Sequence, residues 1–335
     1  MSFTCKAAAL KAAVLAAGMS LGLAGTASAQ TQWIMASGYP ENNFMTQNLR
    51  KWVEDVEKGT SGKLKITLHT NDSLIKLDSI KQAVQRGQVQ GGEIRLGVYG
   101  NEDPMYILDG VPFLASTYDE AWKLMQAQDP YFKSLFDKAG MVITGYQVWP
   151  SQGFYTKMPV NTVEDFKGKK IRIYSTATQR MATLLGFNAT ILPFAEIPQA
   201  FSTGLIEALF TSAQTGTDIQ AWDNTKYFTD VGAILSKNAL IFNKRAYAAL
   251  SPAEQKVVTD ASAAYTKRSW EMSKAAGDEK SAILKKNGMT VTAGPPAVIS
   301  AMKKVGMTMA DEWKATASPP AQAVLTGYMS GQKTN

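Results

Sequence analysis

The sequence alternates short apolar runs, which predict strands, with amphipathic runs, which predict helices, and this alternation occurs twice along the chain. Such a pattern is typical of a parallel sheet with helices packed on its faces. In the first half, the predicted strands are residues 33–37, 63–69, 93–99 and 141–148, and the predicted helices are residues 44–58, 77–85 and 117–124. In the second half, the predicted strands are residues 170–174, 189–192 and 206–210, and the predicted helices are residues 179–185 and 197–202. The sequence therefore predicts an α/β fold with two lobes.

Two segments are suited to carry the chain between the lobes. Residues 149–153 are rich in structure breakers, and a β run over residues 231–243 returns the chain toward the first lobe. Ser251 at the N-cap, followed by Pro and Glu, predicts one helix over residues 251–286, about 50 Å long, that spans both lobes. The alternative is two shorter helices broken near Gly277. We assign residues 30–149 with 235–270 to lobe I, and residues 150–234 with 271–335 to lobe II.

The first 29 residues predict an export signal that is cleaved. Lys6 and Lys11 form a basic start, residues 12–23 are apolar, and residues 27–29 form a small-x-small cleavage site. The alternative is a short membrane anchor, but the apolar run is short for about 30 Å of hydrocarbon and no basic stop follows it. We expect the mature chain to begin at Gln30.

The composition excludes several kinds of chemistry. The only cysteine, Cys5, leaves with the signal, and the only histidine, His69, ends a predicted strand, so we expect no disulfide, thiolate metal site, metal or cofactor. An enzyme would have to use carboxylates or lysines. The net charge falls from +7 to +5 without the signal, which carries two lysines and no acid. The remaining lysines are scattered along polar helix faces, which argues against a nucleic-acid surface and favours small anions.

Three of the seven arginines are candidate ligand-binding residues: Arg95, Arg172 and Arg180. Arg172 lies in a predicted strand directly after a turn, where its planar guanidinium could hold a carboxylate through two parallel hydrogen bonds. The alternative is a structural salt bridge. Arg180 falls near the start of the next helix, where clefts of α/β proteins collect anions, so we expect it at the cleft rim. Its alternative is a surface cation.

Residues 164–172 resemble the D-L/F-K-G-x-K-I-R motif of the solute receptors of tripartite ATP-independent periplasmic (TRAP) transporters, the DctP type. Further stretches agree with that family in order and spacing, so that the resemblance covers essentially all of residues 30–330. These stretches are residues 109–114, 185–186, 193–196, 203–207 and 251–255.

The resemblance implies a periplasmic-binding-protein-like receptor whose lobes close on an organic acid and deliver it to integral-membrane TRAP subunits. It gives the role of carboxylate clamp to Arg172, and pocket positions to Phe194, Thr211 and, allowing for one gap, Ser175. We expect no nucleic-acid partner and a monomer. We also expect the lobes to hinge at the crossovers while the long helix flexes.

The sequence departs from the family at two places. Some members carry a second arginine in the crossover, where this chain has Gln152 and Tyr155 instead, and residues 207–212 are less polar than in sugar-acid receptors. Together with Tyr39, these residues favour a smaller or more apolar acid, aromatic acids included. The alternatives are an ABC-type receptor and an exported lyase-like enzyme, which would need paired carboxylates beside Arg172.

Overall fold

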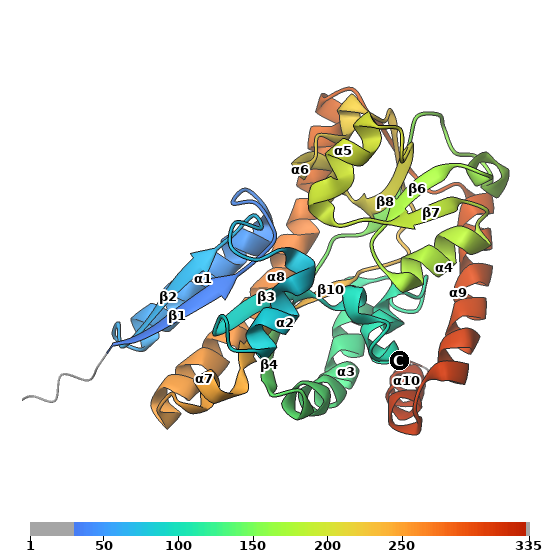
Figure 1. The fold of residues 1–335 in the computed structure, drawn as a ribbon. Helices are drawn as coiled ribbons and strands as arrows, with labels where there is room; N and C mark the ends of the chain where they lie inside the picture. The colour runs from blue at the N-terminus through green and yellow to red at the C-terminus, as the bar shows by residue number, and fades with distance from the viewer. Residues whose placement is uncertain (1–29, 333–335) are drawn as a thin grey trace, which may run out of the picture.

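A computed structural model describes residues 30–332, and the predicted export signal lies outside the described residues. The chain forms two sheets with helices around both (Figure 1). The first sheet has the order β2-β1-β3-β10-β4, with β1 Thr31–Ala36, β2 Leu64–His69, β3 Gly91–Arg95, β4 Met141–Val148 and β10 Lys237–Asn243. The second has the order β11-β9-β5-β8-β6-β7, with β5 Gln152–Thr156, β6 Lys170–Ile173, β7 Asn188–Ile191, β8 Ala208–Ser212, β9 Tyr227–Asp230 and β11 Thr290–Ala293.

The helices agree with the predicted alternation and extend it. The α-helices are α1 Phe44–Gly59, α2 Ile80–Gln85, α3 Tyr118–Lys138, α4 Thr176–Leu184, α5 Ile197–Ser202, α6 Ala213–Asp218, α7 Lys244–Ala248, α8 Pro252–Lys286, α9 Pro296–Thr316 and α10 Pro319–Gln332. The 3₁₀ turns are η1 Leu77–Ser79, η2 Leu96–Tyr99, η3 Pro104–Gly110, η4 Val163–Phe166, η5 Phe194–Glu196 and η6 Ala221–Asp223. None of the helices within residues 30–332 combines the length and apolar character needed to cross a bilayer.

Both sheets are mixed rather than parallel throughout. In the first, β1 pairs parallel with β2 and β3, but β10 lies antiparallel between β3 and β4. In the second, β6 pairs parallel with β7 and β8, whereas β5 is antiparallel to β8 and β9. Strands β5 and β10 follow the first and the second passage between the sheets, and β11, which follows the third, lies parallel to β9. The predicted parallel arrangement therefore holds within each lobe's local strand–helix units and is wrong for β5 and β10.

Three predicted elements differ in extent. The β run expected over residues 231–243 is a linker followed by β10, and the strand expected over residues 93–99 ends at Arg95 and continues as η2. The helix expected over residues 117–124 continues to Lys138 and includes Pro130. Its N-terminus is the predicted capping box of Thr117 and Glu120.

Helix α8 is one continuous helix, so the alternative of a break near Gly277 is wrong. Its N-terminus is the predicted capping box of Ser251 and Glu254. The helix packs against α1 and β4 beside the first sheet and against α6 and β11 beside the second. Hydroxyl groups on α8 meet edge strand β4: Thr266 Oγ1 accepts from Tyr146 N, and Ser269 Oγ from Val148 N, each at 3.0 Å. The helix thereby holds both lobes together.

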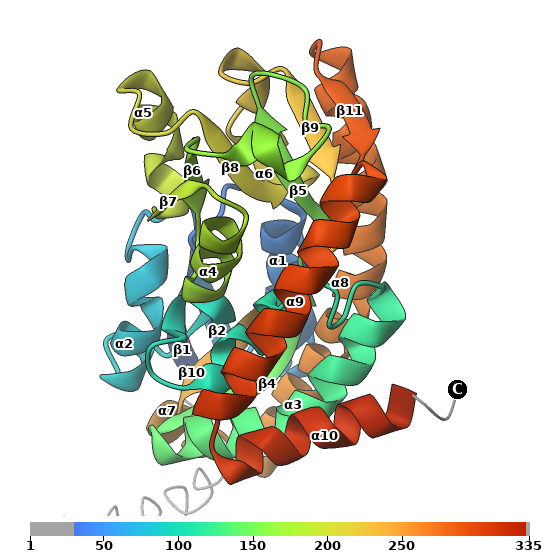
Figure 2. The same cartoon turned by 90° about the vertical axis from the view of Figure 1, so that its right-hand side faces the viewer.

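Helix α9 also runs from one core to the other. Val298 and Met302 pack in the core of the second sheet with Phe154, while Trp313 packs in a core of the first. Figure 2 shows α9 crossing the molecule and α10 lying under α3. The predicted lobe boundaries stay a prediction, and the packing of α10 on α3 favours assigning that helix to the first lobe, although the sequence had placed it in the second.

Candidate functional site

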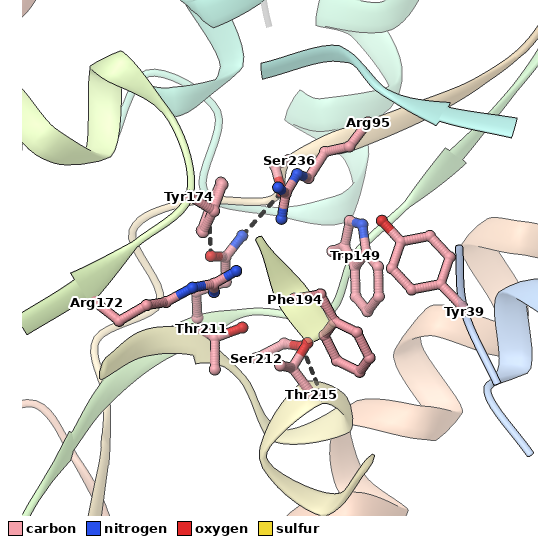
Figure 3. Close-up of a pocket in the computed structure, with 11 residues that line it drawn as sticks. Tyr39, Arg95, Trp149, Arg172, Tyr174, Phe194, Thr211, Ser212, Thr215 and Ser236 are labelled. Atoms are coloured by element: carbon pink, nitrogen blue, oxygen red, sulfur yellow. Dashed lines mark hydrogen bonds between the residues drawn. The ribbon is translucent and has the colours of Figure 1, made fainter. Parts of the chain in front are cut away.

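A cavity lies between the two sheets, and the space between its lining atoms, open solvent included, is about 310 Å³. The residues lining it come from the ends of strands and the turns after them in both lobes (Figure 3). They are Tyr39, Arg95, Trp149, Gln152, Arg172, Tyr174, Phe194, Thr211, Ser212, Thr215 and Ser236.

Arg172 enters the cavity from the interior of β6. Its side chain is 1% exposed, and the Nε group donates to the carbonyl oxygen of Leu192 at 3.0 Å. Nη2 has no hydrogen-bond partner, and no carboxylate within residues 30–332 lies within ion-pair distance. Burial, and then the charge of Arg95, lowers the pKa of Arg172 to about 9, so the group remains protonated at neutral pH. A buried cation without an acid is a strong attractor for an anion.

Arg95 enters the same space from the other lobe, at the end of β3 (Figure 3). Its guanidinium carbon lies 5.0 Å from the centre of the Tyr174 ring, and that of Arg172 lies 5.7 Å from it. Asp78 is 3.8 Å from Arg95 Nη2. The sequence indicates Arg95 as one of three candidate arginines but does not predict it to be a site residue. Its position within a predicted strand, like that of Arg172, is the signal that could have selected it.

Three aromatic rings form the opposite wall. Tyr39 contacts Trp149 edge to face at 5.1 Å between ring centres, and Phe194 at 6.0 Å. Tyr39 follows β1 in the first lobe and Phe194 belongs to η5 in the second, so this contact joins the lobes across the cavity. The wall is suited to cover the apolar face of a small ligand.

A buried polar network fixes the wall from behind. Trp149 Nε1 donates to Asn238 Oδ1 at 2.9 Å, and Asn238 Nδ2 donates to Glu93 Oε1 at 3.1 Å. Glu93 also accepts from Gln147 Nε2 at 2.7 Å and from Ser37 Oγ at 2.9 Å. All donors to Glu93 are neutral, and burial raises the pKa of its carboxyl. Glu93 therefore orients the ring of Trp149 through Asn238.

Replacing Glu93 with Gln is expected to stabilise the fold increasingly as the pH rises. Folding raises the pKa of Glu93 above its unfolded value of about 4.3. The wild-type protein therefore loses stability, relative to the Gln variant, as the pH rises from about 4.3 toward the folded-state pKa. Glutamine keeps the acceptor for Asn238 and Gln147 and can donate to Ser37. Thermal unfolding from pH 4 to pH 8 measures the difference, with exposed Glu271→Gln as a control. If the stability gained by Glu93→Gln over the wild type fell as the pH rises, the prediction would be contradicted.

The remaining polar lining is held by its own hydrogen bonds. Gln152 Nε2 donates to Ser236 Oγ at 3.0 Å, and Tyr174 Oη donates to Gln152 Oε1 at 2.6 Å. Ser212 caps α6 by accepting from Thr215 N at 3.3 Å. These groups have fixed directions, so they can orient a ligand without first being reorganised.

Five of the eight predicted site residues meet at the cavity, namely Tyr39, Gln152, Arg172, Phe194 and Thr211. Ser175 instead caps α4 by accepting from Thr178 N. Tyr155 lies beneath α6, donates to the carbonyl of Ser212 at 3.1 Å and stacks on Phe228. The sequence did not commit to six lining residues: Arg95, Trp149, Tyr174, Ser212, Thr215 and Ser236.

Arg180, expected at the cleft rim, is the exposed partner of Glu312 on α9. Its Nε and Nη2 groups donate to the two carboxylate oxygens of Glu312 at 2.9 and 2.6 Å. It does not line the cavity. This arrangement agrees with the alternative of a surface cation.

Arg180→Gln is therefore expected to leave ligand affinity unchanged within about twofold and to leave the free energy of unfolding nearly unchanged, since exposed ion pairs contribute little. Titration calorimetry with a monocarboxylate and a dicarboxylate measures the first effect, and thermal unfolding the second. A selective loss of dicarboxylate binding would return Arg180 to the site.

The part of the cavity wall that the structure describes carries no pair of carboxylates. Among residues 30–332, no Asp or Glu side chain lines it. Within the same residues, no three His, Cys, Asp or Glu side chains gather so as to hold a metal ion. The paired carboxylates that a lyase-like enzyme would place beside Arg172 are thus not part of this wall.

Comparisons with known proteins agree with this geometry. The model of a family described as bacterial extracellular solute-binding protein, family 7 (DctP), matches residues 35–316. The solved structure of DctP7, a Bordetella pertussis extracytoplasmic solute receptor binding pyroglutamic acid, is 40% identical, with a TM-score of 0.87 over 89% of this chain and 99% of that chain. A marine metagenome TRAP solute-binding protein specific for pyroglutamate is 32% identical, with a TM-score of 0.87 over 90% and 99%. The ectoine/5-hydroxyectoine-binding periplasmic protein UehA of Ruegeria pomeroyi is 25% identical over 75% of each chain.

Proposed function

Because this chain belongs to the DctP family of bacterial extracellular solute-binding proteins, which are receptors and not enzymes, we propose that its cavity captures a small monocarboxylate, with pyroglutamate as the first candidate. The family is one of periplasmic TRAP receptors for carboxylates, so the ABC-type and lyase-like alternatives do not apply. The two pyroglutamate receptors, at 40% and 32% identity, support that choice of ligand.

One observation carries the proposal: the free Nη2 group of buried Arg172. A carboxylate in the cavity would accept from this group and neutralise the guanidinium, removing the cost of a buried unpaired cation. The rings of Tyr39, Trp149 and Phe194 would cover an apolar ligand face. The expected preference for an aromatic acid stays a prediction.

Titration calorimetry on the chain from Gln30, refolded to remove carried ligand, tests the proposal. Pyroglutamate is compared with 2-pyrrolidinone, which has the same ring without the carboxylate, and with benzoate and glucuronate. We expect pyroglutamate to bind at least about 100-fold more tightly than 2-pyrrolidinone, since a buried charge-assisted pair is lost. Equal binding of these two ligands, or binding of no acid at all, would overturn the proposal.

The proposed working cycle follows from the two-lobed fold. The lobes would hinge at residues 149–153 and 231–236 and close on the acid, because the cavity wall is built from both sheets. The closed receptor, a monomer, would then deliver the acid to the integral-membrane TRAP subunits. Cleavage before Gln30 would release it into the periplasm, and intact mass of the exported protein measures that cleavage.

A further inference from the structure

The two arginines of the cavity differ in their acidic surroundings. Arg95 has Asp78 at 3.8 Å, whereas Arg172 has no acid within ion-pair distance among the described residues. Both guanidinium groups face the ring of Tyr174, and each is close enough to the other for Arg95 to lower the pKa of Arg172. The cavity therefore holds two cations, of which Arg95 has an acidic neighbour and Arg172 has none among the described residues.

Asp78 belongs to the short turn η1, which leads into α2 beside β3. Its side chain is 37% exposed, while that of Arg95 is 8% exposed. Arg95 is its only ion-pair partner within residues 30–332. The distance of 3.8 Å is too long for a direct hydrogen bond, so Asp78 offsets the charge of Arg95 while leaving its N–H groups free to donate. The Nε group of Arg95 has no partner.

We propose that Asp78 makes the cavity selective for monocarboxylates: it neutralises Arg95, which then donates to an uncharged acceptor of the ligand, while Arg172 takes the single carboxylate. This inference rests on the proposed function. Two cations and one acid leave one positive charge, which a monoanion balances. A dicarboxylate would bury a second negative charge near Asp78 without a free cation, which is costly.

Glu93 does not alter this comparison. It lies behind Trp149, and its oxygens accept from the neutral side chains of Ser37, Gln147 and Asn238. Whatever charge it carries is the same for every ligand. The difference between one and two ligand charges therefore depends on Asp78, the acid that faces Arg95.

The test uses two ligands of the same shape, glutarate and its monoamide glutaramate, which differ by one charge. Wild-type protein should prefer glutaramate in titration calorimetry at pH 7.5. In Asp78→Asn, the charge of Arg95 is no longer offset, and the affinity ratio should shift toward glutarate by at least about tenfold. Asp78→Glu should keep the wild-type ratio, because it keeps the charge.

Asp119→Asn is the matched control, since it removes the same charge from an exposed position on α3 and should leave the ratio unchanged. An unchanged ratio in Asp78→Asn, or a wild-type preference for glutarate, would overturn the inference while leaving the carboxylate receptor intact. If the proposed function itself is wrong, the wild-type protein will bind none of glutarate, glutaramate and pyroglutamate. The inference would then be wrong as well.

Discussion

Arg172→Lys is expected to weaken the binding of a carboxylate ligand by about 100-fold. The shorter, compact ammonium of lysine cannot form two parallel hydrogen bonds to a carboxylate, and it cannot at the same time keep the bond from Nε to the carbonyl of Leu192. Losing one partner of a buried, hydrogen-bonded charge pair costs about 2–5 kcal/mol, which is about 30-fold to several thousand-fold in affinity. Titration calorimetry with pyroglutamate measures the effect.

The matched control is Arg50→Lys. Arg50 forms an exposed ion pair with Glu41 on the surface of α1, so the same chemical change there should leave ligand affinity unchanged. Thermal unfolding of both variants without ligand shows whether either substitution disturbs the fold. If Arg172→Lys binds pyroglutamate within about threefold of the wild type, Arg172 is not the clamp.

Gly153→Ala is expected to lower the free energy of unfolding by about 3 kcal/mol or more. Gly153 lies in β5 between β8 and β9, and a Cβ atom there would stand 2.2 Å from the carbonyl oxygen of Thr229 and 2.8 Å from Cα of Asp230. Both are backbone atoms of a paired strand, which cannot turn away as a side chain could. The midpoint of thermal unfolding should therefore fall by about 5 °C or more.

Gly327→Ala is the control for this experiment. Gly327 lies in α10 with nothing within 4 Å of an added Cβ, so alanine should be neutral or slightly stabilising there. Since residue 153 follows directly on Gln152 of the cavity, ligand binding to the folded fraction is measured as well. A thermal midpoint within about 1 °C of the wild type would contradict the expected clash.

The sequence predicts the elements whose signals are local. The capping boxes at Thr117 and Ser251 correctly mark the starts of α3 and α8, because each cap is formed by residues three positions apart. Pro130 and Gly277 are different, since both lie inside helices that tertiary packing continues through them. Pro and Gly disfavour a helix only locally, and packing against the rest of the fold can outweigh that local cost.

The site depends more on partners distant in sequence. Arg172 could be chosen from its strand and its motif, and the structure brings it to the cavity. The surface position of Arg180 could not be predicted in the same way, because its partner Glu312 is 132 residues away in the sequence. No sequence pattern around Arg180 indicates this ion pair. Likewise, the antiparallel placement of β10 between β3 and β4 arises from the return of the chain, which strand–helix alternation does not encode.

The hydroxyl groups of α8 have a consequence for how this protein behaves at high concentration. Strand β4 is the edge of the first sheet, and the unpaired N–H and C=O groups of an open edge are a template on which another chain can add as a strand. The hydroxyl groups of Thr266 and Ser269 accept hydrogen bonds from the outward N–H groups of Tyr146 and Val148. These N–H groups are therefore not available to a strand from another chain. The helix that joins the lobes thereby also guards this edge of the sheet against edge-to-edge aggregation.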